Sequence, residues 1–141
     1  MSLPPLAEDR RSRRFADGYD RVFAEVERTF LGPIRTRLVG QLTGRVAEIG
    51  AGTGANVRHY AAADHVTLVE PFPAMRTHLQ RRLDGRQGGI PMEVVDGRAE
   101  ALPFEDGSVD AVVSTLVLCS VADVERALAE VRRVLAPGGV F

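Results

Sequence analysis

EIGAGTGAN, residues 48–56, is the stretch from which the fold can be deduced. It grows out of a short, largely apolar run at residues 46–49, which predicts a buried strand. The alternating glycines let the backbone turn sharply and let a ligand approach it closely. We expect a helix over residues 56–62, whose N-terminal amides would face the same point and favour a carboxylate or a phosphate. The stretch therefore predicts a site for a partly anionic ligand.

Downstream of this loop, apolar runs alternate with helical stripes. The alternation predicts right-handed crossovers and a parallel sheet covered on both faces, which is an α/β fold. After the Pro-Gly-Gly turn of residues 137–139, another strand opens at Val140. The expected strands are residues 66–69, 92–95 and 109–115, and the expected helices are residues 74–83 and 121–135.

Upstream of the loop, the spacing of the apolar residues predicts helices. Residues 1–11 are expected to form a loose lead-in, and an amphipathic helix should follow and end at Gly32-Pro33. A second helix is expected over residues 34–42. We therefore divide the chain into an N-terminal helical segment, residues 1–44, and a core, residues 45–141. The apolar stripe of the first helix consists of Phe15, Tyr19, Val22, Val26 and Phe30.

Composition narrows the function classes. The chain has 141 residues, enough for one domain, and a net charge of -1, so no overall basic field favours nucleic acid. Every basic residue is arginine, which excludes a lysine Schiff base. Cys119 is the single cysteine and is expected to be a small packed hydrophobe; no metal site is predicted. No apolar run reaches about 18 residues, so we expect no membrane span and a cytoplasmic location.

Glu70 follows the second expected strand, and its position narrows the range of possible ligands. Ligands of open α/β sheets bind outside the carboxyl ends of the strands. A carboxylate there can accept two hydrogen bonds from the hydroxyls of a ribose. The spacing of Gly50, Gly52 and Ala55 also fits the dinucleotide fingerprint, so a nicotinamide or flavin dinucleotide stays open at this point.

Four segments in order resemble the class I S-adenosylmethionine-dependent methyltransferases of the type 11 branch. They are EIGAGTG (48–54), LVEPFPAM (68–75), GRAEALPFEDGSVDAVVS (97–114) and EVRRVLAPGGVF (130–141). The resemblance implies a Rossmann-like three-layer sandwich with a mostly parallel sheet. Dehydrogenases have no reason to carry the last two segments, which disfavours the dinucleotide. Residues 115–121 are similar to the small-thiol methyltransferase-like subgroup.

The resemblance implies a set of cofactor-binding residues. Glu48 would lie near the ammonium group of S-adenosylmethionine, Glu70 would hold the ribose, and Ala99 would offer its N–H to the adenine. Phe72 and Met75 would cover the adenine or simply belong to the core. Tyr19 would lie on a lid formed by the N-terminal helices, or be ordinary core. The full set is Tyr19, Glu48, Gly50, Ala51, Gly52, Gly54, Glu70, Pro71, Phe72, Met75, Gly97, Arg98, Ala99, Thr115 and Leu116.

One position departs from the family pattern. Arg98 stands where relatives often have an aspartate that accepts from the adenine amino group, and arginine has no acceptor. That amino group would instead reach Glu100, Asp96 or a backbone carbonyl, or Arg98 would stack on the ring.

The implied reaction is transfer of a methyl group to a small-molecule acceptor of the thiol, phenol or quinol class, with S-adenosylhomocysteine as product. Asp20 is the only candidate for a general base. A non-catalytic module that binds S-adenosylmethionine is the alternative. Relatives continue past the Pro-Gly-Gly turn, so we expect a fragment that lacks its C-terminal strands, and the alternative is that a partner chain supplies the missing strand. Its fourth strand would then have an unpaired edge through which copies of the chain could associate.

Overall fold

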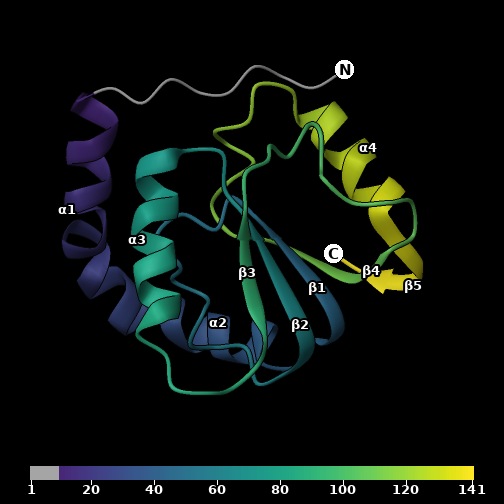
Figure 1. Ribbon diagram of the computed structural model, residues 1–141, viewed down its shortest axis with the longest axis horizontal. Helices are drawn as coiled ribbons and strands as arrows, with labels where there is room; N and C mark the ends of the chain where they lie inside the picture. Colours follow the sequence, from purple (N-terminus) through teal and green to yellow (C-terminus); the bar gives the residue numbers. More distant parts are fainter. Residues whose placement is uncertain (1–9) are drawn as a thin grey trace.

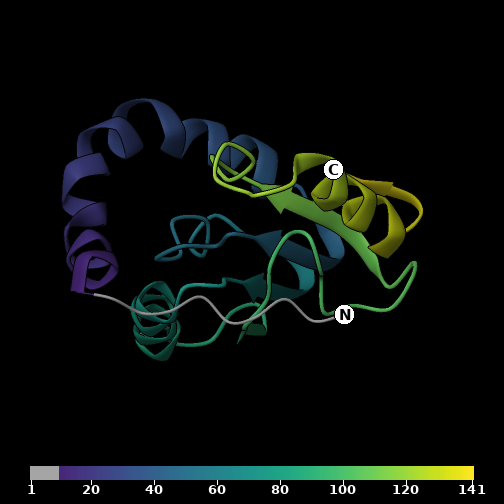
Figure 2. The same ribbon diagram turned by 90° about the horizontal axis from the view of Figure 1, so that it is seen from above.

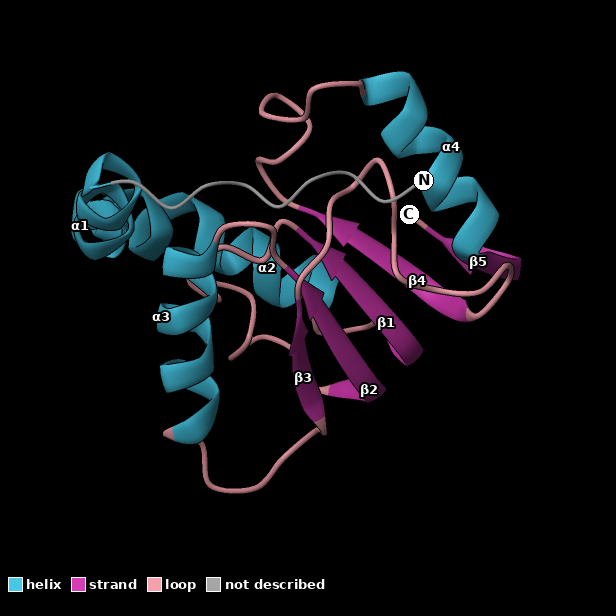
Figure 3. Cartoon of the chain, turned by 45° about the horizontal axis from the view of Figure 1, so that its top comes forward, coloured by secondary structure: helices cyan, strands magenta, loops and turns pink. Residues whose placement is uncertain are grey.

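Five parallel strands form a single sheet in the computed structural model, which describes residues 10–141. Their order across the sheet is β3-β2-β1-β4-β5. Every neighbouring pair is parallel. The carboxyl ends of the strands therefore lie at one edge, where the connecting loops gather (Figure 3). This confirms the predicted α/β class. The strands are β1 (Thr43–Ile49), β2 (Ala62–Val69), β3 (Met92–Val95), β4 (Val109–Ser114) and β5 (Leu135–Val140).

Helices cover both faces of the sheet. Alternate strand residues, such as Val46 and Leu68, pack on one face with α3 (Pro73–Asp84) and α2 (Gly32–Val39). The intervening residues pack on the other face against α4 (Val124–Val134). Figure 1 shows α3 and α4 on opposite sides of the strands. A fully buried parallel sheet needs apolar side chains on both faces, which is why its strands read as continuous apolar runs. The predicted three-layer sandwich is confirmed.

The N-terminal helices are continuous, contrary to the expected break at Gly32-Pro33. Helix α1 (Arg10–Val26) passes through a π-helical turn, η1 (Glu27–Leu31), directly into α2. Figure 2 shows the three elements as one bent arc. Pro33 has no N–H to donate, and the wider turn absorbs that loss because the Gly32 N–H bonds to the Glu27 carbonyl, five residues back. Of the expected lead-in, residues 1–9 lie outside the described residues.

The connection between β1 and β2 holds no helix, so the helix expected over residues 56–62 is wrong. Consecutive tight turns replace it, with bonds from Gly54 N–H to the Ala51 carbonyl and from His59 N–H to the Asn56 carbonyl. The side chain of Asn56 is fully buried and bonds to distant groups, and such bonds compete with helix formation. The helix N-terminus expected behind the glycines is therefore absent from residues 50–61.

Strand β5 begins directly after α4 and pairs with β4, so the expected unpaired edge of the fourth strand is wrong for its first half. Val109 pairs with Leu135 and Ala111 with Val140. The Pro-Gly-Gly sequence lies within this irregular strand instead of preceding it. Within residues 10–141, no helix is both long and apolar enough to cross a membrane.

Candidate functional site

A cleft of about 370 Å³ lies at the carboxyl ends of the strands. Most of the predicted cofactor residues line it: Tyr19, Gly50, Gly52, Glu70, Pro71, Phe72, Met75, Arg98, Ala99 and Leu116. The others do not: Glu48, Ala51, Gly54, Gly97 and Thr115. Glu100, an alternative contact predicted for the adenine amino group, also lines the cleft. The predicted cofactor set omitted several other lining residues, namely Phe15, Val117, Ser120, Val121 and Ala122. The last four lie in the loop after β4, whose residues 115–121 the sequence already linked to the small-thiol methyltransferase-like subgroup.

Glu70 is the buried carboxylate of the cleft. It directly follows β2 and is 3% exposed. Its Oε2 accepts the N–H of Gly52 at 2.8 Å, and its Oε1 accepts the N–H of Phe72 at 2.9 Å. Burial raises the pKa of Glu70, and the two backbone donors partly offset that rise. Each carboxylate oxygen retains a free lone pair, so Glu70 can still accept from vicinal hydroxyls of a ligand.

Gly50 and Gly52 have different structural roles in the loop. Both have positive φ, +63° at Gly50 and +58° at Gly52. A Cβ on Gly50 would lie 2.5 Å from Cγ2 of Val117, so this glycine allows the loop after β4 to pack closely. A Cβ on Gly52 would meet nothing within 4 Å, because the residue faces the open cleft. Gly52 therefore leaves bare backbone where a ligand can approach.

Apolar side chains form the wall of the cleft next to Glu70. Met75 packs with Ala16 and Tyr19, so it belongs to a small core cluster and to the cleft at once. Tyr19 packs edge-on against Phe15, with ring centroids 5.4 Å apart. Burial raises the pKa of Tyr19 and keeps its hydroxyl neutral. This wall suits a flat, uncharged ring.

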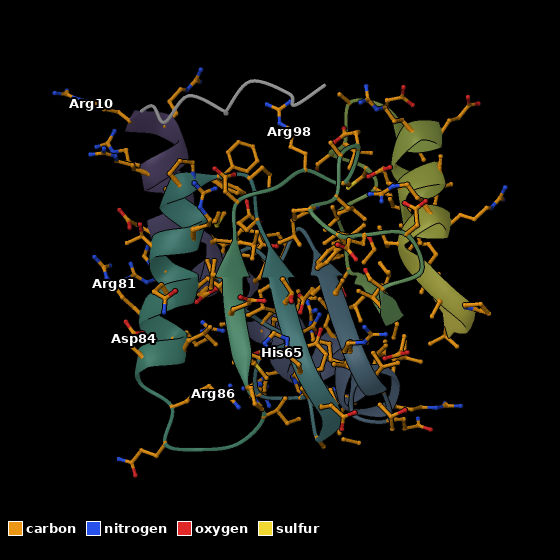
Figure 4. The ribbon with its side chains drawn as sticks, turned by 45° about the vertical axis from the view of Figure 1, so that its right-hand side comes forward. Arg10, His65, Arg81, Asp84, Arg86 and Arg98 are labelled. Carbon is orange, nitrogen blue, oxygen red and sulfur yellow. The ribbon has the colours of Figure 1, made fainter. Side chains whose placement is uncertain are left out.

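Arg98 and Glu100 also line the cleft. The side chain of Arg98 points away from the sheet, above the strand ends (Figure 4). Glu100 is buried and accepts the N–H groups of Ala122 at 2.8 Å and Asp123 at 3.4 Å. It therefore fastens the loop after β4 to the loop after β3. Asp96 instead forms an ion pair with Arg76 at 2.9 Å.

The loop after β4 is strained where it borders the cleft. Leu116 has a φ of +60°, which costs a leucine about 1–3 kcal/mol. Such strain is concentrated at ligand sites. Cys119 is exposed, contrary to the expected packed hydrophobe, and its sulfur lies 3.6 Å from the Leu116 carbonyl.

Two acidic residues expected at the site are engaged elsewhere. Glu48 is buried beneath the glycine loop, and its carboxylate accepts from Asn56 at 3.0 Å and from Tyr60 at 2.7 Å. Burial raises its pKa to about 7. Asp20 forms an ion pair with Arg82 and accepts from the hydroxyl of Thr53. Because Thr53 belongs to the glycine loop, these contacts hold α1 against that loop. Asp20 does not line the cleft.

Known proteins match this arrangement. The family model described as "Methyltransferase domain" matches residues 47–141. The human thiol S-methyltransferase TMT1A is 44% identical over 95 residues, which cover 67% of this chain and 39% of that protein. The ubiquinone/menaquinone biosynthesis C-methyltransferase UbiE of Methylobacterium nodulans is 38% identical over 115 residues, which cover 79% of this chain and 43% of that protein. The chain thus spans about two fifths of the length of these curated relatives.

A solved structure extends the match to the fold. The structure of DhpI in complex with SAH has a TM-score of 0.74 and 28% identity, and the match covers 91% of this chain and 62% of that one. The matched family segment includes the glycine loop, Glu70 and the loops after β3 and β4 that line the cleft. We conclude that the chain belongs to the methyltransferase domain family, whose members use S-adenosylmethionine.

Proposed function

We propose that the chain binds S-adenosylmethionine in the cleft and transfers its methyl group to a small-molecule acceptor. The observation that carries this proposal is Glu70: a buried carboxylate at the end of β2, held by two backbone amides and open to the cleft. A ribose offers the two vicinal hydroxyls that such a carboxylate binds.

The other residues fit the remaining parts of the cofactor. Gly52 leaves room for the ligand to pass close to the backbone, and Phe72 and Met75 offer an apolar surface for the adenine. Ala99 and Glu100 also line the cleft and would meet the adenine edge. Tyr19 would cover the cofactor from α1. The N-terminal helical segment, residues 1–44, then acts as a lid on the core, residues 45–141.

A thiol is the acceptor class that we favour. When bound, S-adenosylmethionine supplies a methyl group already activated by its sulfonium. The protein must then align the acceptor and exclude water. A thiol has an ordinary pKa of about 8.5, so a few per cent is already thiolate near neutral pH and no strong base is needed. This agrees with the engagement of Asp20 by Arg82, and one relative is a thiol S-methyltransferase by name. Phenols and quinols are the other classes to test.

Two further predictions belong to this proposal. A cytoplasmic location stays a prediction of the sequence. Self-association through a sheet edge also stays one, now at β5, where Val140 and the adjacent Phe141 are exposed. Light scattering over a range of concentrations would measure it, and a monomer at all of them would contradict it.

The direct test is calorimetric titration with S-adenosylhomocysteine, followed by product analysis with a panel of thiols, phenols and quinols. Saturable one-to-one binding and a methylated thiol would support the proposal. Binding without any methylated product would support the non-catalytic module instead. Preference for NAD over S-adenosylhomocysteine would contradict the cofactor assignment.

A further inference from the structure

A network of buried side-chain hydrogen bonds lies beneath the glycine loop. Nη1 of Arg35, on α2, donates to Oδ1 of Asn56 at 2.8 Å. Nδ2 of Asn56 donates to Oε1 of Glu48 at 3.0 Å and to Oγ1 of Thr115 at 3.2 Å. Tyr60 donates to the other oxygen of Glu48 at 2.7 Å. The network thus joins α2, β1 and the end of β4.

Asn56 connects Arg35 to Glu48 in this network, and the orientation of its amide group follows from these two partners. Arginine has donors only, so the amide oxygen of Asn56 must face Arg35. A carboxylate has acceptors only, so the amide nitrogen must face Glu48. Glu48 and Asn56 lie at the two ends of the glycine loop, eight residues apart. Their hydrogen bond therefore closes the loop from below.

The π-helical turn supplies the counter-charge of Arg35. Glu27, the first residue of η1, accepts from Nε of Arg35 at 3.0 Å and from Nη2 at 2.6 Å. In a regular α-helix, residues eight apart differ in direction by roughly 80°. One extra residue in the π turn reduces that difference to roughly 20°, so the two side chains meet.

Gly32 makes this turn sterically possible. A Cβ on Gly32 would lie only 2.8 Å from the carbonyl oxygen of Glu27. The Gly-Pro dipeptide therefore installs the turn that aligns Glu27 with Arg35.

Because the network is buried, the loss of any one of its charged partners should be costly. The side chain of Arg35 is 7% exposed and that of Glu27 is 20% exposed. A buried charge must be paired, and removal of one partner leaves the other uncompensated. The guanidinium also lowers the pKa of Glu48 against the larger effect of burial.

We propose that Arg35 is a positioning residue for the cofactor loop, which it holds through Asn56 and Glu48 from the N-terminal helical segment. The proposal rests on the proposed function, since the loop is taken to bind S-adenosylmethionine. It implies that the N-terminal segment acts on the cofactor site from below as well as covering it from above.

The test compares Arg35→Met with Arg37→Met, the same change at an exposed position of the same helix. Amide hydrogen exchange over residues 50–57 is measured in the unliganded chain, well below the melting temperature of each variant. Affinity for S-adenosylhomocysteine is measured by calorimetry. We expect Arg35→Met to exchange about tenfold faster in this segment and to bind about tenfold more weakly. Arg37→Met should behave as the wild type.

A double-mutant cycle separates positioning from mere stability. If Arg35 acts through Asn56, then Arg35→Met combined with Asn56→Ala should bind no more weakly than Asn56→Ala alone. Additive losses, or wild-type exchange in Arg35→Met, would overturn the proposal. If the folded wild type itself does not bind S-adenosylhomocysteine, the proposed function fails, whereas the exchange comparison still decides the role of Arg35.

Discussion

The backbone N–H of Gly52 and the carboxylate of Glu70 are joined by a hydrogen bond of 2.8 Å across the mouth of the cleft. The bond links the loop after β1 to the end of β2, so the two ligand-facing segments hold each other in place. A second backbone donor, the N–H of Phe72, faces the other oxygen. The carboxylate is therefore oriented before any ligand arrives.

Replacement of Glu70 by glutamine should weaken cofactor binding severely. Whichever way the amide is turned, its NH₂ group faces the N–H of either Gly52 or Phe72, and the ribose loses an acceptor. We expect a loss of roughly 2–3 kcal/mol, or about 100-fold in the dissociation constant for S-adenosylhomocysteine. Calorimetry measures it, with the exposed Glu105→Gln as control. Unchanged affinity in a folded Glu70→Gln variant would remove Glu70 from the site.

Alanine at Gly50 should destabilise the fold more than alanine at Gly52. Gly52→Ala adds a Cβ in open space, so it should cost only the left-handed backbone strain of about 1 kcal/mol in unfolding free energy. Its methyl group enters the cleft and should weaken cofactor binding. Gly50→Ala must also displace Val117 and should cost roughly 3 kcal/mol. Urea denaturation of both variants checks the order, and equal destabilisation would contradict it.

Stability should depend on the titration of Glu48. Burial raises its pKa from 4.5 to about 7, so the folded state holds this proton more tightly than the unfolded state. Its contribution to the free energy of unfolding is then fully present below about pH 4.5 and is lost as the pH rises through about 7. Glu70, whose pKa is also raised, adds to the same trend.

Denaturation of the wild type and Glu48→Gln at several pH values between 4.5 and 8 measures this effect. The variant lacks the titrating group, so its stability relative to the wild type should improve as the pH rises to about 7 and then level off. A difference that is constant across this range would mean that Glu48 keeps the same charge in both states.

Asp20→Asn should loosen the contact between α1 and the glycine loop. The carboxylate pairs with Arg82, and this half-exposed ion pair is worth less than about 1 kcal/mol. We expect faster amide exchange in α1 and modestly weaker cofactor binding, with little change in the maximal rate. A large loss of maximal rate at unchanged cofactor affinity would instead restore Asp20 as a general base. Arg82→Met is the matched variant, since it breaks the same pair from the other side.

The sequence alone determined the parallel sheet, the glycine loop and the place of Glu70. Each is a local pattern: a run of apolar residues, a spacing of glycines, an acid at the end of a strand. Such patterns report on backbone geometry and burial, which neighbouring residues decide among themselves. They therefore predicted the layers of the fold, the glycine loop and Glu70, whereas the other predicted cleft residues came from the resemblance to the methyltransferases.

Tertiary structure decided what the local patterns got wrong. Residues 56–62 look helical, but Asn56 bonds to Arg35, 21 residues earlier, and to Thr115, 59 residues later. The Gly-Pro at residue 32 looks like a helix end, but the π turn carries the chain through it and aligns Glu27 with Arg35. Asp20 looked free to act as a base until the fold brought Arg82 to it. In each case a buried or paired polar side chain takes its partner from a distant element, and only the assembled fold determines which element that is.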